Sequence, residues 1–101
     1  MSTSPSDTIR LLLVDDEIEF LDAVTPGLER RGLDVTPAES GHAALQLLSR
    51  HTFDVVVLDV KMPSIDGVDT FRRIKGMVPD LPVILLTGHG NLQQAVSRVC
   101  R

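Results

Sequence analysis

The chain has 101 residues, enough for one domain and too few for two domains of ordinary size. Hydrophobic residues make up 43% and charged residues 24%, a globular balance, and no apolar run approaches the roughly 20 residues that a membrane span needs. The net charge of -4 disfavours direct nucleic-acid binding, and the single cysteine, Cys100, excludes an internal disulfide and suits a reducing cytoplasm.

The first third of the chain predicts a lead-in, a strand and a helix. Residues 1–8 are rich in Ser and Thr and lack the features of a secretory signal, so we expect a disordered lead-in followed by one domain over residues 9–101. Residues 9–14 are apolar except for Arg10, which is typical of a strand buried on both faces. A helix that stops near Gly32 is then predicted by apolar residues at helical spacing, namely Ile18, Leu21, Val24 and Leu28.

The rest of the chain repeats this alternation of strand and helix. Short apolar runs predict three further strands, at residues 33–37, 53–58 and 83–86. The helices that come after them are expected to begin near Ser40, Gly67 and Asn91. The apolar side of each helix is expected to be core, as are the three phenylalanines; these positions include Val68, Phe71 and Ile74 in the third helix, with Phe20 and Phe53 elsewhere.

Four strand and helix pairs, with connections long enough for right-handed crossovers, predict an α/β fold with a doubly wound parallel sheet of flavodoxin-like strand order. Ligands of such sheets bind outside the carboxyl ends of the strands. Three of the four expected strands end in polar residues, which are Asp15-Asp16, Asp59 and Thr87-Gly88. We therefore expect these residues to converge.

Carboxylates at neighbouring strand ends repel one another, by about 4 kcal/mol per pair at 4 Å and an effective dielectric near 20. A divalent cation relieves this repulsion, and hard oxygen ligands favour Mg²⁺ over Zn²⁺ or copper. Once the charge is screened, Asp59 can act as a carboxylate nucleophile toward phosphorus. Taken alone, Asp15 and Asp16 would instead be expected to cap the first helix, and Asp59 to be an ordinary turn residue.

The chain resembles the receiver domains of bacterial response regulators, the CheY-like domains, over nearly its whole length. The resemblance rests on the segments LLLVDDE, VVVLDVKMPSIDG and VILLTGHG. It implies two-component phosphorelay signalling in the cytoplasm, with a histidine kinase or phosphotransfer protein as donor and an output domain or partner protein as reader. The LTGHG ending is similar to regulators of transcription.

The resemblance also implies a role for each residue of the site. Asp59 is the expected phosphoacceptor and is a metal ligand as well. Asp16 is expected to bind Mg²⁺ directly, and Asp15 is its water-bridged companion. The backbone carbonyl of Lys61 is expected to be a further metal ligand.

Further family features concern the residues after the fourth strand. The hydroxyl of Thr87 is expected to shift toward the phosphoryl group, and the small Gly88 to leave the site open to the donor. Family members carry a fifth strand and helix, with a catalytic Lys at the end of that strand, and the sequence reaches Arg101 before either. Residues 83–86 are then expected to form an apolar edge, so we expect either that the chain is a fragment of a longer regulator or that it self-associates through this strand and the last helix.

Two alternatives to a phosphorylation-controlled switch are open. A phosphohydrolase commonly carries a general acid two residues after its nucleophilic Asp, but Lys61 stands there, so we expect self-phosphorylation and self-dephosphorylation and no turnover of a substrate. The second alternative is an interaction or dimerisation fragment that cannot be phosphorylated. Metal binding without phosphorylation would identify it.

Overall fold

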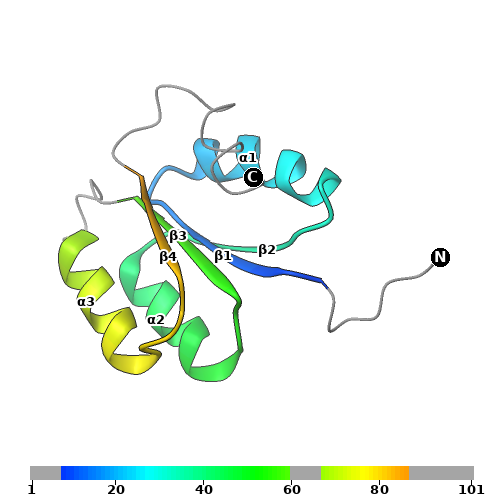
Figure 1. The fold of residues 1–101 in the computed structure, drawn as a ribbon. Helices are drawn as coiled ribbons and strands as arrows, with labels where there is room; N and C mark the ends of the chain where they lie inside the picture. Colours follow the sequence, from blue (N-terminus) through cyan, green and yellow to red (C-terminus); the bar gives the residue numbers. More distant parts are fainter. Residues whose placement is uncertain (1–7, 60–66, 87–101) are drawn as a thin grey trace.

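The computed structural model describes residues 8–59 and 67–86. Within these ranges strands and helices alternate along the chain, as predicted (Figure 1). Residues 1–7 of the predicted lead-in and the helix expected to begin near Asn91 lie outside the described residues. The strands are β1 (Arg10–Val14), β2 (Asp34–Ala38), β3 (Val55–Asp59) and β4 (Val83–Leu86), and the helices are α1 (Ile18–Arg30), α2 (Gly41–Arg50) and α3 (Gly67–Met77).

The strands form one parallel sheet in the order β2-β1-β3-β4, which confirms the predicted doubly wound topology. The register pairs Val14 of β1 with Ala38 of β2 and with Leu58 of β3. It also pairs Asp59, the last residue of β3, with Leu86, the last residue of β4. The carboxyl ends of all four strands therefore meet at one edge of the sheet.

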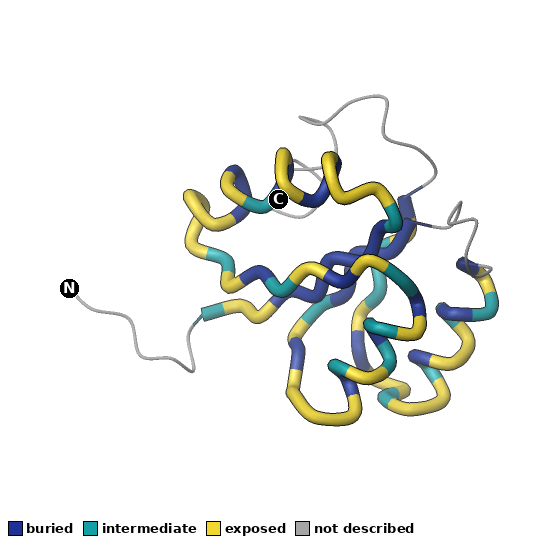
Figure 2. The backbone as a smooth tube through the Cα atoms, turned by 180° about the vertical axis from the view of Figure 1, so that it is seen from behind, coloured by how far each residue is buried: buried dark blue, intermediate teal, exposed yellow. Residues whose placement is uncertain are grey.

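Helices cover both faces of the sheet, with α1 on one face and α2 and α3 on the other (Figure 1). Successive strand residues point to opposite faces, so Leu11 and Leu13 join the core under α1 while Leu12 and Val14 join the core under α2 and α3. Figure 2 shows the buried strands between helices whose outer surfaces are exposed. Burial on both faces explains why β1 is an almost continuous apolar run.

The predicted bounds of β4 are confirmed, whereas the other three strands begin one or two residues later than predicted. Ile9 is 49% exposed and precedes β1. The predicted start of α2 is confirmed, since the side chain of Ser40 accepts a hydrogen bond from the backbone N–H of Ala43 at 3.1 Å. In the described ranges no helix has both the length and the apolar character that crossing a membrane requires.

Two predicted core positions are wrong. Ile18 is 54% exposed and Val68 is 46% exposed. Both lie in the first turn of a helix, where each helix follows the carboxyl end of a strand. Phe20 and Ile74 are buried as predicted.

Candidate functional site

Asp15 lies between β1 and α1 and has no exposed surface. Its backbone N–H donates to the carbonyl of Ala38 at 3.0 Å, which continues the pairing of β1 with β2 past the strand end. One carboxylate oxygen accepts a hydrogen bond from the backbone N–H of Glu17, the residue before α1, at 2.9 Å. The N-cap residue of α1 is Glu17 and not Asp15 or Asp16, and the bond from its N–H holds the Asp15 carboxylate beside the helix start.

Asp59 and Asp16 complete an acidic cluster with Asp15. Asp59 ends β3 and is 2% exposed, while Asp16 is half-buried in the turn after β1. One carboxylate oxygen from each of the three residues lies within 4.8 Å of the other two. The predicted convergence is confirmed for these three residues. Lys61, Thr87 and Gly88 lie outside the described residues, so their place in the site stays a prediction.

The cluster gathers like charges in a place with little access to water. Each pair of carboxylates at about 4 Å repels by about 4 kcal/mol at an effective dielectric near 20, which disfavours the folded chain unless a cation is present. One oxygen from each carboxylate lies within 4.8 Å of the other two, so a single small cation could be held among them once the side chains adjust. All three donors are hard oxygens, and the residues present therefore fit Mg²⁺.

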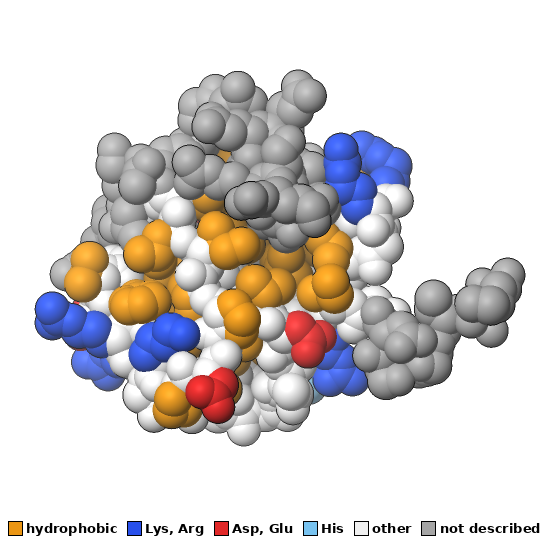
Figure 3. Space-filling view, in the orientation of Figure 1, with side chains coloured by type: hydrophobic (Ala, Val, Ile, Leu, Met, Phe, Trp, Pro, Cys, Tyr) orange, Lys and Arg blue, Asp and Glu red, His pale blue; other side chains and the backbone are white. Residues whose placement is uncertain are grey.

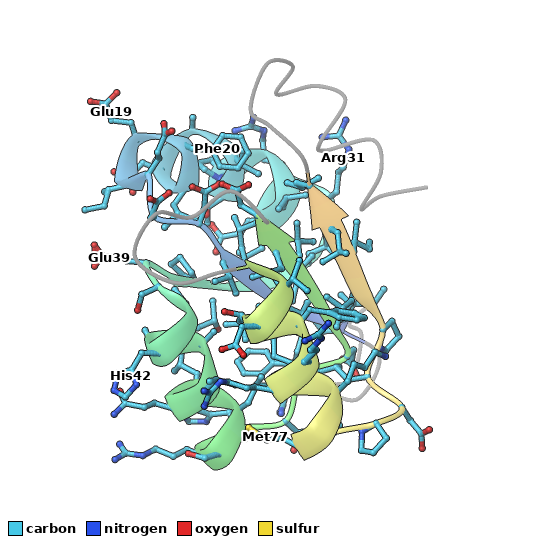
Figure 4. All side chains as sticks on the ribbon, turned by 90° about the vertical axis from the view of Figure 1, so that its left-hand side faces the viewer. Glu19, Phe20, Arg31, Glu39, His42 and Met77 are labelled. Atoms are coloured by element: carbon cyan, nitrogen blue, oxygen red, sulfur yellow. The ribbon has the colours of Figure 1, made fainter. Side chains whose placement is uncertain are left out.

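An acidic cavity lies beside the cluster at the start of α1. This shallow cavity of about 390 Å³ is lined by Asp16, Glu17, Ile18 and Glu19. Figure 4 shows Glu19 pointing away from the sheet. Asp16 is common to the cavity and the cluster, so the cavity adjoins the cluster at this residue.

Sequence reasoning found each of the clustered carboxylates but missed the hydrogen bond between Asp15 and the backbone of Glu17. The signal for it was present, because Asp often accepts a hydrogen bond from the backbone N–H two residues later. No sequence pattern indicated a cavity at the opposite edge of the sheet, where Arg10 and Asp34 begin their strands.

The model of the response regulator receiver domain family matches residues 11–99. Among curated relatives, the C4-dicarboxylate transport transcriptional regulatory protein DctD of Rhizobium meliloti (strain 1021) is 38% identical over 99 residues, which are 98% of this chain and 21% of that protein. The chain therefore spans about a fifth of the length of this relative.

Solved structures show the same similarity. A receiver domain protein (CheY-like) from Methanospirillum hungatei JF-1 is 26% identical with a TM-score of 0.77, and the match covers 92% of this chain and 75% of that one. A response regulator from Burkholderia pseudomallei, solved with a phosphorylated aspartic acid, calcium ion and citrate, is 28% identical with a TM-score of 0.74 over 90% of this chain and 54% of that one. With the fold, the acidic cluster and the family match in agreement, this chain belongs to the receiver domains of two-component response regulators.

Proposed function

We propose that Asp59 accepts a phosphoryl group from a histidine kinase or a phosphotransfer protein, and that the phosphorylated chain changes conformation to control transcription through an output domain or partner protein. The observation that carries this proposal is the buried carboxylate of Asp59 at the end of a central strand, clustered with Asp15 and Asp16. The relative DctD is named a transcriptional regulatory protein, which supports the proposed control of transcription. The Burkholderia structure contains a phosphorylated aspartic acid, which supports the proposed phosphorylation of Asp59.

The proposed transfer forms one bond and breaks one. A carboxylate oxygen of Asp59 attacks the phosphorus of a phosphohistidine, the P–N bond breaks, and its electron pair returns to the imidazole nitrogen of the donor. The product is an acyl phosphate on Asp59. The low exposure of Asp59, 2%, limits the access of water that would otherwise hydrolyse this product.

Mg²⁺ is the proposed cofactor, with Asp16 and Asp59 as direct ligands, Asp15 as a ligand through water, and the backbone carbonyl of Lys61 as a further ligand. When bound, Mg²⁺ offsets the negative charge on the phosphoryl oxygens and on the cluster. The hydrogen bond from Glu17 N–H holds Asp15 in place for this role.

Thr87 and Gly88 are proposed to act after transfer. Thr87 directly follows Leu86, which is the register partner of Asp59. In the proposal the Thr87 hydroxyl donates a hydrogen bond to the phosphoryl group, and Gly88 leaves room for the donor. This movement would shift a two-state equilibrium that the output reads.

The test is phosphorylation of the chain by acetyl phosphate or phosphoramidate, with and without Mg²⁺, followed by intact mass. The wild type and Asp80→Asn, an exposed residue between α3 and β4, are expected to gain one phosphoryl group only with Mg²⁺. Asp59→Asn is expected to gain none. An adduct on Asp59→Asn, or none on a folded wild type, would contradict the proposal.

We propose no turnover of a separate substrate, since the chain supplies the nucleophile and is itself the product. Its chemistry is then limited to self-phosphorylation from a donor and self-dephosphorylation. The cytoplasm is the proposed compartment, because histidine kinases of two-component systems transfer their phosphoryl groups there. The alternative of a fragment that cannot be phosphorylated is not favoured by the match to the receiver family.

Self-association through β4 is a further proposal about partners. Within the described residues β4 pairs with β3 alone, and its four residues contain no charge and no Pro that would protect an edge. Leu85 is 38% exposed, and Figure 3 shows hydrophobic side chains gathered over this strand and its neighbours. A second copy pairing along β4 would cover them. The last helix, also expected to take part, lies outside the described residues.

Sedimentation velocity over a range of concentrations tests this association. We expect the wild type to form a dimer as its concentration rises and Leu85→Lys to remain monomeric, because a charge on an edge strand opposes pairing. Leu47→Lys on α2, half-buried and away from β4, is the matched control. A wild type that is monomeric at all concentrations would refute the association.

A further inference from the structure

We propose that the amino end of the sheet, opposite the aspartate cluster, carries a binding site for a small zwitterion of the α-amino-acid class. A cavity of about 230 Å³ opens between the first residues of β1 and β2 and the C-terminal end of α2. Its lining residues are Arg10, Asp34, Thr36, Leu47, His51, Thr52 and Phe53, of which Arg10 and Asp34 carry full and opposite charges.

Two opposite charges face this cavity without neutralising one another. Arg10 and Asp34 are register partners in the parallel pairing of β1 with β2, and both are exposed. No ion pair joins them, although both lie in the described part of the chain. The guanidinium of Arg10 instead donates to the backbone carbonyl of Thr52 at 3.3 Å, on the side of the strand away from β2.

Backbone hydrogen bonds hold the start of β1 toward β3, on the side away from Asp34. The N–H of Arg10 donates to a carboxylate oxygen of Asp54 at 2.8 Å, and the N–H of Asp54 donates to the carbonyl of Arg10 at 2.8 Å. This reciprocal pair of bonds holds the start of β1 against the segment before β3. The Arg10 side chain donates to Thr52 next to this segment, and Asp34 is a lining residue of the same cavity.

The pattern of charges selects the class of ligand. A simple anion would be attracted by Arg10 but repelled by Asp34. A simple cation would be attracted by Asp34 but repelled by Arg10. A zwitterion satisfies both, with its carboxylate on the guanidinium and its ammonium on Asp34. Phe53 is 9% exposed and Leu47 is half-buried, so together they offer an apolar surface to an aliphatic side chain.

The size of the cavity further limits which ligands it can bind. Sites for drug-sized ligands are about 300–1,000 Å³, and this cavity is smaller. A single aliphatic amino acid is small enough for a cavity of about 230 Å³. The site is independent of the phosphoryl chemistry, because it lies where the strands begin and not where they end.

The test is titration of ¹⁵N-labelled chain with L-leucine, followed through the backbone amides of Thr36 and Phe53. We expect saturable shifts, and binding weaker by about tenfold or more for L-leucinamide, which lacks the carboxylate, and N-acetyl-L-leucine, which lacks the ammonium. Arg10→Gln and Asp34→Asn are each expected to weaken L-leucine binding by a similar factor. Arg73→Gln on α3, exposed and not among the residues that line the cavity, is the control and is expected to bind like the wild type.

Three outcomes would overturn the proposal. The first is the absence of saturable shifts in the folded wild type. The second is equal binding of L-leucine and N-acetyl-L-leucine, which would show that Asp34 recognises nothing. The third is unchanged affinity in Asp34→Asn. Because both charged residues are exposed, the variants are expected to remain folded, and the dispersion of the same spectra verifies this.

Discussion

The central strands β1 and β3 differ from the outer strands β2 and β4 in how deeply they are buried and in the residues at their carboxyl ends. Residues 11–14 of β1 and 56–58 of β3 are at most 1% exposed. In contrast, β2 contains exposed Asp34 and Pro37, and β4 contains Leu85 at 38% exposure. The clustered aspartates belong to the ends of the central strands alone. A cluster of like charges costs stability, and it is placed where burial of apolar side chains can offset that cost.

The largest expected effect comes from weakening a central strand directly before the cluster. Leu58→Ala removes a fully buried side chain next to Asp59 and is expected to lower the free energy of unfolding by about 3 kcal/mol. Leu85→Ala, at the register partner of Leu58 on β4, is expected to cost less than about 1 kcal/mol because its side chain is already partly in water. Urea unfolding of both variants measures the difference. An equal decrease in the free energy of unfolding for both variants would show that the central and the outer strand contribute equally to stability.

The next effect concerns the cation that the cluster is proposed to hold. Mg²⁺ at about 100 times its dissociation constant is expected to stabilise the wild type by about 2.7 kcal/mol. Asp15→Asn keeps an oxygen for the Glu17 N–H but loses a charge, so most of this stabilisation is expected to disappear. Thermal unfolding with and without Mg²⁺ measures it, and Asp80→Asn is the control. If Mg²⁺ stabilises Asp15→Asn as much as the wild type, Asp15 does not contribute to the metal site.

The smallest effect is repulsion within the cluster when no divalent cation is present. Asp59→Asn is expected to raise the free energy of unfolding by about 1 kcal/mol in EDTA, since it relieves part of the repulsion with Asp15 and Asp16. Asp80→Asn, exposed between α3 and β4, is expected to change it little. Urea unfolding in EDTA compares them. Destabilisation by Asp59→Asn would mean that its carboxylate is stabilising even without metal.

Local sequence signals predicted some features of the fold better than others. The bounds of β4 were predicted correctly because Pro82 precedes the strand and a clear change of composition comes after it. Ile18 and Val68 were misplaced because helical periodicity identifies the side of a helix and says nothing of whether a strand lies beneath a given turn. Of the candidate site, Asp15, Asp16 and Asp59 were found from the strand ends, while Lys61, Thr87 and Gly88 remain predictions.

Periodicity and residue type in the sequence were enough to predict the alternation of strands and helices, the parallel sheet, and the identity of the carboxylates at the strand ends. The packed chain was needed to bring three carboxylate oxygens within 4.8 Å, and to set Arg10 and Asp34 at one cavity without pairing. The reason is that periodicity acts over a few residues, whereas these distances depend on register between strands. Asp15 and Asp59 are far apart along the chain, and they meet because Val14 pairs with Leu58.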